Sequence, residues 1–259
     1  MPEMTSYEPG EPCWADLASP DPEAAKVFYG GLFGWGSSTP ADPGFGGYTS
    51  FTLGGVEGDE VAGLMELMDE RQPPAWTCYI SVADADETAD AVTAAGGQVY
   101  TPPMDVAGLG RMAVFGDSQG AVFGVWEPGD FAGARRVNEP GALCWTELAC
   151  RDIEAAKAFY GSVIGWESVT EPAGTTTYTE WTTDGRSIAG MVQMNEEWPD
   201  DAPPYWMPYF AVEDCDAAAD KAVALGGRVP VPPTDIPPGR FAVVADPDGA
   251  YLSIIRLTG

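Results

Sequence analysis

The sequence predicts an α+β protein of tandem βαβββ units that form two modules, each a curved mixed sheet with helices on its outer face. Two observations predict this fold: a repeat that runs through the whole chain, and a weaker repeat inside each half. Residues 10–35 and 141–166 are identical at 15 of 26 positions, at an offset of 131. Self-similarity at a long, fixed offset indicates a duplicated structural unit.

The repeat continues in the same order to the end of both halves. Asp117–Gly120 in the first half, for example, matches Asp246–Gly249 in the second. The segment between the halves is rich in proline, glycine and charge, which is typical of a linker. We therefore expect a first module at residues 1–128, a linker at 129–140 and a second module at 141–259.

Each half of each module begins with a strand and a helix. A short apolar strand ends at Asp21, and Pro22 and Glu23 follow. Aspartate at the N-cap, proline in the first turn and glutamate near the positive end of the helix dipole are typical of a helix start. An aspartate follows an apolar strand at three further points, at Asp84, Asp152 and Asp214. We interpret all four as helix caps and not as catalytic carboxylates.

Short segments with alternating or β-branched residues follow the helices and are predicted to be strands. In the first module they are Tyr48–Leu53, Val61–Leu67, Gln98–Thr101, Met112–Phe115 and Ala121–Trp126, with a further strand at 76–83. The order is a strand, a helix and three strands, four times over.

Composition excludes several classes of partner. Forty acidic residues against twelve basic ones give a net charge of −28, and such a field repels phosphate backbones and anionic membranes. The acidic residues are spread over both halves, which indicates a solvated surface. No apolar run reaches the roughly 18–20 residues of a membrane span, and the first residues lack the features of a signal peptide. We expect no nucleic-acid or membrane partner and a cytoplasmic protein.

Cysteine and histidine give no support for a metal cluster. The chain has no histidine, and its five cysteines form no C-x-x-C pair. A disulfide framework or zinc cluster is therefore not expected. Most of the cysteines stand in apolar runs, where a reduced cysteine acts as a small hydrophobic residue.

The repeated run W-x-D/E-L-A-x-x-D-x-E-A-A-K-x-F-Y-G-x-x-x-G-W is followed by Y/F-x-V-x-D, A-x-G-G and D-P-D-G segments. This pattern resembles the vicinal-oxygen-chelate superfamily of glyoxalases, bleomycin resistance proteins and extradiol dioxygenases. The likeness covers nearly the whole chain. It is strongest to two-module actinomycete glyoxalase-like proteins that are labelled "hydroxylase" in aromatic-polyketide gene clusters. The resemblance implies two glyoxalase-like modules, but it leaves function open because the superfamily holds both metalloenzymes and drug-binding proteins.

The resemblance also implies where metal ligands would stand. Metal-dependent members supply His or Gln from the first strand, His from the strand that opens the second half, and Glu from the last strand. Such a site needs several nitrogen or oxygen ligands and open positions for substrate. The corresponding positions here are Trp14, Thr77 and Gly124 in the first module and Trp145, Met207 and Ser253 in the second. None is a good ligand for a divalent cation, so we expect neither a metal nor another cofactor.

The same positions predict a cavity with aromatic walls. Because strand side chains alternate, residues two positions from a cavity-facing residue face the cavity as well. The expected lining is Trp14, Asp16, Thr77, Tyr79, Val122 and Trp126 in the first module, and Trp145, Glu147, Met207, Tyr209, Tyr251 and Ile255 in the second. Apolar walls with few polar groups suit a small, flat, hydrophobic ligand.

Two points about the expected cavities remain open: the role of two matched arginines, and whether the cavity side chains bind a ligand at all. Arg111 and Arg240 follow glycine at matched points, and they either pair with Asp16 and Glu147 or contact oxygens of a ligand. In the alternative, the tryptophans simply fill each cavity as core and the carboxylates accept structural hydrogen bonds.

The leading hypothesis is metal-free binding of a small aromatic or hydrophobic metabolite, by an antibiotic-binding or biosynthetic accessory protein. The alternative is a metal-independent isomerase, cyclase, lyase or hydroxylase-like enzyme. Asp16 or Glu147 would then be the general base, and Tyr79 or Tyr209 would donate to an enolate oxygen. A third hypothesis is an interaction protein whose cavities are filled. Both a monomer and a homodimer remain open, because the superfamily builds sites by pairing modules.

Overall fold

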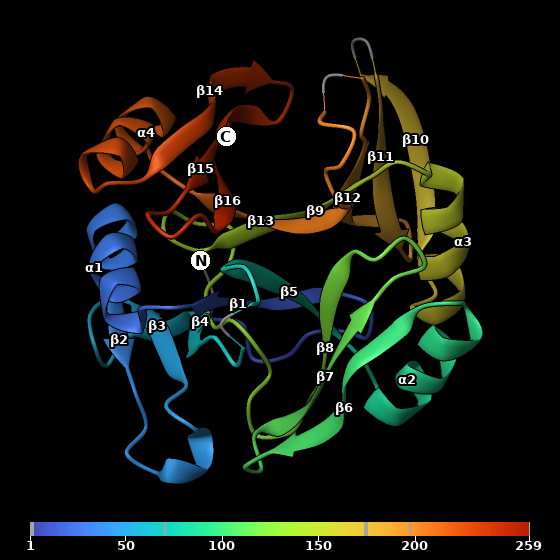
Figure 1. Ribbon diagram of the computed structural model, residues 1–259, viewed down its shortest axis with the longest axis horizontal. Coiled ribbons are helices and arrows are strands. Elements are labelled where there is room, and N and C mark those ends of the chain that lie inside the picture. The colour runs from blue at the N-terminus through green and yellow to red at the C-terminus, as the bar shows by residue number, and fades with distance from the viewer. Residues whose placement is uncertain (1–2, 70, 174–175, 197, 259) are drawn as a thin grey trace.

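The computed structural model describes residues 3–69, 71–173, 176–196 and 198–258 (Figure 1). In these ranges sixteen strands form two eight-stranded sheets. The strand order is β2-β3-β4-β1-β5-β8-β7-β6 in module one and β10-β11-β12-β9-β13-β16-β15-β14 in module two. Each module runs strand, helix and three strands, twice over. The predicted α+β fold of tandem βαβββ units is confirmed.

In module one the elements are β1 (Pro12–Ser19), α1 (Pro22–Phe33), β2 (Gly36–Ser38), a short 3-10 helix (Pro43–Phe45), β3 (Thr49–Leu53), β4 (Asp59–Glu66), β5 (Ala75–Ser81), α2 (Ala85–Ala94), β6 (Gln98–Val106), β7 (Gly110–Gly116) and β8 (Val122–Pro128). In module two they are β9 (Leu143–Cys150), α3 (Ile153–Val163), β10 (Glu167–Ala173), β11 (Thr176–Thr183), β12 (Arg186–Gln193), β13 (Tyr205–Ala211), α4 (Cys215–Ala224), β14 (Arg228–Ile236), β15 (Gly239–Ala245) and β16 (Tyr251–Leu257).

Most strand bounds differ from the sequence prediction by one or two residues, and two strands differ more. β2 is only three residues long and had no predicted counterpart. β6 extends to Val106 instead of ending at Thr101, and it runs through Pro102 and Pro103. These prolines are tolerated because β6 is an edge strand, where a missing backbone N–H need not break a ladder.

The four helix-capping aspartates are confirmed. The carboxylates of Asp21, Asp84, Asp152 and Asp214 each accept a hydrogen bond from the backbone N–H three residues later, at 2.9–3.0 Å. Their acceptor oxygens satisfy N–H groups that the first helical turn leaves without partners.

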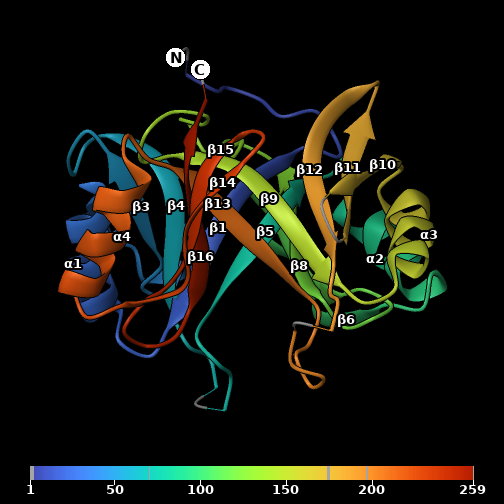
Figure 2. The ribbon, with the colours of Figure 1, turned by 90° about the horizontal axis from the view of Figure 1, so that it is seen from above.

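The hydrophobic cores are shared between the modules. One core joins the first half of module one to the second half of module two, and the other joins the remaining halves. Accordingly, α1 lies beside α4 and α2 beside α3 (Figures 1 and 2). Phe210 of module two packs against Trp35 and Trp76 of module one, with ring centroids 5.2 and 5.3 Å apart.

Two buried hydrogen bonds cross the same interface. Tyr29 donates to Asp246 at 3.0 Å, and Tyr160 donates to Asp117 at 3.1 Å. The other oxygen of Asp117 accepts from the backbone N–H groups of Gln119 and Ala121. The repeated F-Y-G and D-x-x-G motifs therefore hold the modules together.

The two sheets lie back to back, so their concave faces point in opposite directions (Figure 1). We call the face of the module-one sheet opposite the helices cup one, and its counterpart in module two cup two. Cup one is built around Trp14, Tyr79 and Trp126, and cup two around Met207, Tyr209 and Ile255. Among the described helices, none is long and apolar enough to cross a membrane.

Candidate functional site

A hydrogen-bonded network of four side chains lies on the floor of cup one. The Trp14 indole donates to the Tyr48 hydroxyl at 2.8 Å, and Tyr48 donates to Asp16 at 3.3 Å. Tyr79 donates to the same oxygen of Asp16 at 3.0 Å. Asp16 is only 4% exposed. Burial raises the pKa of Asp16 to about 7, although the two tyrosine hydroxyls act in the opposite direction.

Cup two repeats this network with one substitution, glutamate for aspartate. The Trp145 indole donates to the Tyr178 hydroxyl at 2.9 Å, and Tyr209 donates to Glu147 at 2.8 Å. Tyr178 also hydrogen-bonds to Glu147, and burial raises the pKa of Glu147 above its ordinary value. The predicted site residues Trp145, Glu147 and Tyr209 therefore meet, as Trp14, Asp16 and Tyr79 do in cup one.

Tyr48 and Tyr178 were missed by sequence reasoning. Each lies between the tryptophan and the carboxylate, above a glycine on the neighbouring strand. Gly63 pairs with Asp16, and Gly190 pairs with Glu147. A Cβ atom on either glycine would overlap the tyrosine hydroxyl. The repeated Ala-Gly pair at these points was the available signal, because glycine in a strand often marks close approach by another group.

The positions that the resemblance assigns to metal ligands do not fit a divalent cation. In module one, a side chain at Gly124 would overlap the Tyr79 ring, and the Trp14 nitrogen donates its hydrogen to Tyr48. Thr77 lies on β5 opposite Asp16 and supplies only a hydroxyl. Neutral indole and hydroxyl groups hold divalent cations poorly.

The corresponding positions in module two do not fit a divalent cation either. The Ser253 hydroxyl lies 2.8 Å from the Met207 sulfur, and Trp145 donates to Tyr178. Within the part of the chain that the structure describes, no group of three or more His, Cys, Asp or Glu side chains is placed to hold a metal ion. The side chains at these positions therefore do not support metal-dependent chemistry.

Cup one is closed by the segment 129–140, between β8 and β9, together with Tyr7 near the N-terminus. Phe131 meets Trp14 edge to face with ring centroids 5.1 Å apart, and it meets Trp126 at 5.9 Å. The Trp126 indole donates to the Phe131 carbonyl at 2.8 Å. Trp14, Tyr79 and Trp126 are each no more than 8% exposed as a result.

Backbone hydrogen bonds fix this segment against the sheet. The N–H of Ala134 donates to the Cys13 carbonyl, and that of Arg135 donates to the Glu60 carbonyl, both at 2.8 Å. The Tyr7 hydroxyl donates to the Ala134 carbonyl at 2.6 Å. The direct pairing of β1 with β4 begins only at Asp16. The segment 129–140 therefore forms its backbone hydrogen bonds with the parts of β1 and β4 that precede this pairing.

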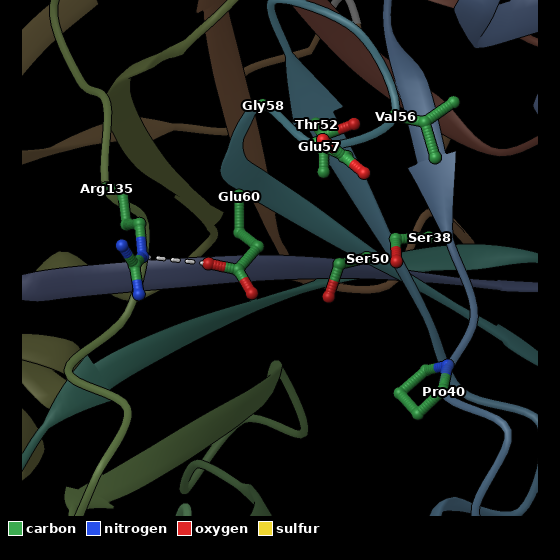
Figure 3. A pocket seen from close by; sticks show the side chains of 9 residues that line it. All are labelled: Ser38, Pro40, Ser50, Thr52, Val56, Glu57, Gly58, Glu60 and Arg135. Atoms are coloured by element: carbon green, nitrogen blue, oxygen red, sulfur yellow. Dashed lines mark ion pairs between the residues drawn. The ribbon is translucent and has the colours of Figure 1, made fainter.

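A polar recess of about 320 Å³ remains at the β2–β3–β4 side of module one (Figure 3). Arg135 forms one wall through an ion pair with Glu60 at 2.9 Å. The other lining side chains are small or acidic: Ser38, Pro40, Ser50, Thr52, Val56 and Glu57. This recess has no aromatic lining and does not suit a flat apolar ligand.

Cup two is contacted from the loop between β12 and β13, where the Trp198 ring lies 6.0 Å from the Tyr205 ring, but among the described residues no aromatic ring packs on Trp145 as Phe131 packs on Trp14. Its apolar cluster is drawn from β9 and β13–β16 alone. Trp145, Tyr205 and Phe241 are half-buried, whereas Met207 and Tyr209 are each 6% exposed at the floor. The predicted site residue Tyr251 begins β16 and is 46% exposed.

The structure places Arg111 and Arg240 away from the two carboxylates. Arg111 forms ion pairs with Asp86 and Asp105, and Arg240 forms them with Asp216 and Asp235. Each arginine thus connects the first turn of a helix to an edge strand. The hypothesis that they pair with Asp16 and Glu147 does not match these contacts.

This fold, with two back-to-back sheets of paired βαβββ units, defines the class of protein. Residues 13–125 and 142–254 each match the Glyoxalase/Bleomycin resistance protein/Dioxygenase superfamily. The chain belongs to this superfamily, and the resemblance drawn from the sequence is confirmed.

Among its relatives is the anthracycline biosynthesis protein DnrV of Streptomyces peucetius. The two are 40% identical over 98% of this chain and 96% of DnrV. Among solved structures, the 2,2',3-trihydroxybiphenyl 1,2-dioxygenase of Sphingomonas wittichii is similar with a TM-score of 0.65 and 13% identity, covering 97% of this chain and 93% of that one. A Mn(II)-bound glyoxalase from Novosphingobium aromaticivorans has a TM-score of 0.64 at 16% identity, covering 95% and 82%. At these identities the structural likeness shows the fold alone.

Proposed function

We propose that cup two binds a small aromatic or hydrophobic metabolite without a metal ion. The observation that carries this proposal is the half-buried aromatic wall of Trp145, Tyr205 and Phe241 above a buried floor that holds one carboxylate. Aromatic walls gain about 0.5–1.5 kcal/mol per ring pair beyond the burial of area. Shielding such a surface from water favours a flat apolar ligand.

The relatives support the same class of ligand. DnrV, 40% identical over nearly the full length of both chains, is an anthracycline biosynthesis protein. This similarity supports a role as an accessory protein in the biosynthesis of an aromatic metabolite. A Mn(II)-bound glyoxalase has the same fold, so the fold does not decide the need for a metal. The poor ligands at the six corresponding positions support binding without one.

Equilibrium dialysis against 2-hydroxyanthraquinone, a planar compound without a chelating oxygen pair, tests the proposal. We expect saturable micromolar binding that Trp145→Leu weakens about tenfold, because it removes the aromatic face. The matched control is Trp14→Leu, the same change in the repeat, which should leave the affinity unchanged because Trp14 is covered by Phe131. Absence of saturable binding by the wild-type protein would reject the proposal.

A second candidate function has its own supporting observation. Burial raises the pKa of Glu147, and a basic carboxylate in an apolar cup suits proton abstraction next to a carbonyl. The Tyr209 hydroxyl donates to Glu147 at 2.8 Å, and once Glu147 had taken the substrate proton this hydroxyl could donate to the enolate oxygen instead. Cup two would then be the site of a metal-independent isomerase or related enzyme.

Glu147→Gln separates the two functions, because it keeps the size of the side chain and removes the base. For a binding protein, Glu147→Gln should bind the aromatic ligand with the same affinity as the wild-type protein. Neither protein should convert the ligand to a product. For an enzyme, binding should persist while product formation falls by at least about a hundredfold, the usual contribution of a general base. Asp16→Asn in the covered cup one is the matched control and should leave either activity unchanged.

A further inference from the structure

Phe131 is an aromatic side chain of the chain's own segment 129–140, and it lies where cup one would hold a ligand. Its ring meets the Trp14 indole edge to face at 5.1 Å, with the ring planes at 89°. It also meets Trp126 at 5.9 Å and 78°. These are favourable geometries for aromatic pairs. The benzyl side chain of Phe131 therefore already occupies cup one.

The walls around Phe131 have matched counterparts in cup two. Trp14 corresponds to Trp145, because each pairs with the equivalent tyrosine on the neighbouring strand. Met112 corresponds to Phe241, and each follows the Gly-Arg pair that opens its strand. The described residues of the cup-two cluster come from strands alone. Trp198, in the loop between β12 and β13, contacts the rim residue Tyr205, but among the described residues no aromatic ring packs on Trp145 as Phe131 packs on Trp14.

We propose that Phe131 is an internal ligand of cup one, and that the equivalent space beside Trp145 in cup two receives one aromatic ring of the metabolite. The second half of this inference rests on the proposed function of cup two. It follows that, within the part of the chain that the structure describes, one of the two copies of the module is left to bind an aromatic ring.

The walls also define the chemistry of the ring that cup two accepts. In cup one the Trp126 indole donates to the Phe131 carbonyl, but Ile255 takes the place of Trp126 on β16. The ring beside Trp145 therefore meets an apolar wall at this point and needs no acceptor atom there. Tyr205, which stands where module one has Ala75, adds an aromatic surface at the rim. A second, linked or fused ring suits this rim.

Fluorine NMR with 4-fluorobenzyl alcohol, whose ring matches that of Phe131, counts the sites directly. The wild-type protein should show one bound resonance, and Trp145→Ala should remove it. Phe131→Ala should add a second bound resonance, which the double variant Phe131→Ala, Trp145→Ala should retain as its only one. Phe131→Leu is the matched control, because it keeps apolar bulk in cup one and should keep the wild-type count.

The outcomes separate this inference from the proposed function. Two bound resonances in the wild-type protein, or one that Phe131→Ala fails to supplement, would overturn the inference while leaving ligand binding intact. A resonance that appears only with Phe131→Ala would reject ligand binding by cup two and support the internal ligand. No bound resonance in any variant would overturn both. If Phe131→Ala does not fold, Phe131→Val makes a smaller space, and the loss of the sole resonance in Trp145→Ala remains decisive.

Discussion

The floors of cup one and cup two are built from matching residues, but the segments that cover the two cups differ. In both, a tryptophan donates to a tyrosine that lies over a glycine, and two tyrosines hydrogen-bond to one carboxylate, which is buried in cup one and half-buried in cup two. Only cup one carries the segment 129–140, whose Phe131 packs on Trp14. The same residues therefore serve as core in one copy and as a half-exposed wall in the other. One copy of the site therefore contributes to stability as core, and we propose that the other contacts a ligand.

Alanine at the two matched tryptophans should expose this difference most strongly. Trp14→Ala should lower the free energy of unfolding by about 3–5 kcal/mol, because it empties a buried position. Trp145→Ala should cost roughly half as much, since the half-buried Trp145 loses fewer contacts. Urea unfolding followed by circular dichroism measures both. Equal losses would mean that the two cups are covered to the same extent.

The buried Asp16 should make stability depend on pH in cup one. Its pKa is about 7 in the folded protein, against an ordinary value of 3.8, so the native state binds the proton more tightly than the unfolded chain. The stabilisation is fully present below about pH 4 and is lost as pH rises to about 7. Three pKa units correspond to about 4 kcal/mol at most.

Asp16→Asn removes this group and gives the comparison. The unfolding free energy of wild-type protein minus that of Asp16→Asn should fall between pH 4 and pH 7 and then level off. Glu147→Gln in cup two should show a fall of the same sign, because burial also raises the pKa of Glu147. Curves for wild type and Asp16→Asn that run parallel over this range would contradict the assigned burial of the carboxylate.

The smallest effects should come from the matched arginines. Arg111→Gln and Arg240→Gln remove exposed ion pairs with Asp86 and Asp216, and such pairs contribute little because water screens them. Neither change should alter the affinity for 2-hydroxyanthraquinone in equilibrium dialysis. A marked loss with Arg240→Gln alone would place this side chain at the ligand, as the sequence had suggested.

The sequence was sufficient for the units of the fold because these depend on local patterns. Asp21 and its three counterparts predicted helix starts through the residues that follow them, and strand alternation placed Trp14, Asp16 and Tyr79 on one face. The weak elements, such as the three-residue β2, lacked enough residues to form a pattern.

The contacts across long sequence distances were not accessible in this way. Tyr48 reaches Asp16 from the position just before β3, 32 positions away, and Phe131 covers Trp14 from a segment that its composition marked only as a linker. Alternation gives the face on which a side chain lies, but not its partner or its cover. The ion pairs of Arg111 and Arg240 depend in the same way on how helices pack beside edge strands.

Hydrogen-bonded side chains such as Trp145 occupy the positions that the resemblance assigns to metal ligands, and we therefore expect cup two to bind an aromatic ligand without a metal. The most direct test is the affinity of the protein for 2-hydroxyanthraquinone after dialysis against a chelator, and again after one equivalent of Mn²⁺ or Zn²⁺ is added. We expect the same dissociation constant in both states and in the untreated protein. Binding that is lost on chelation and restored by one equivalent of metal would contradict metal-free binding.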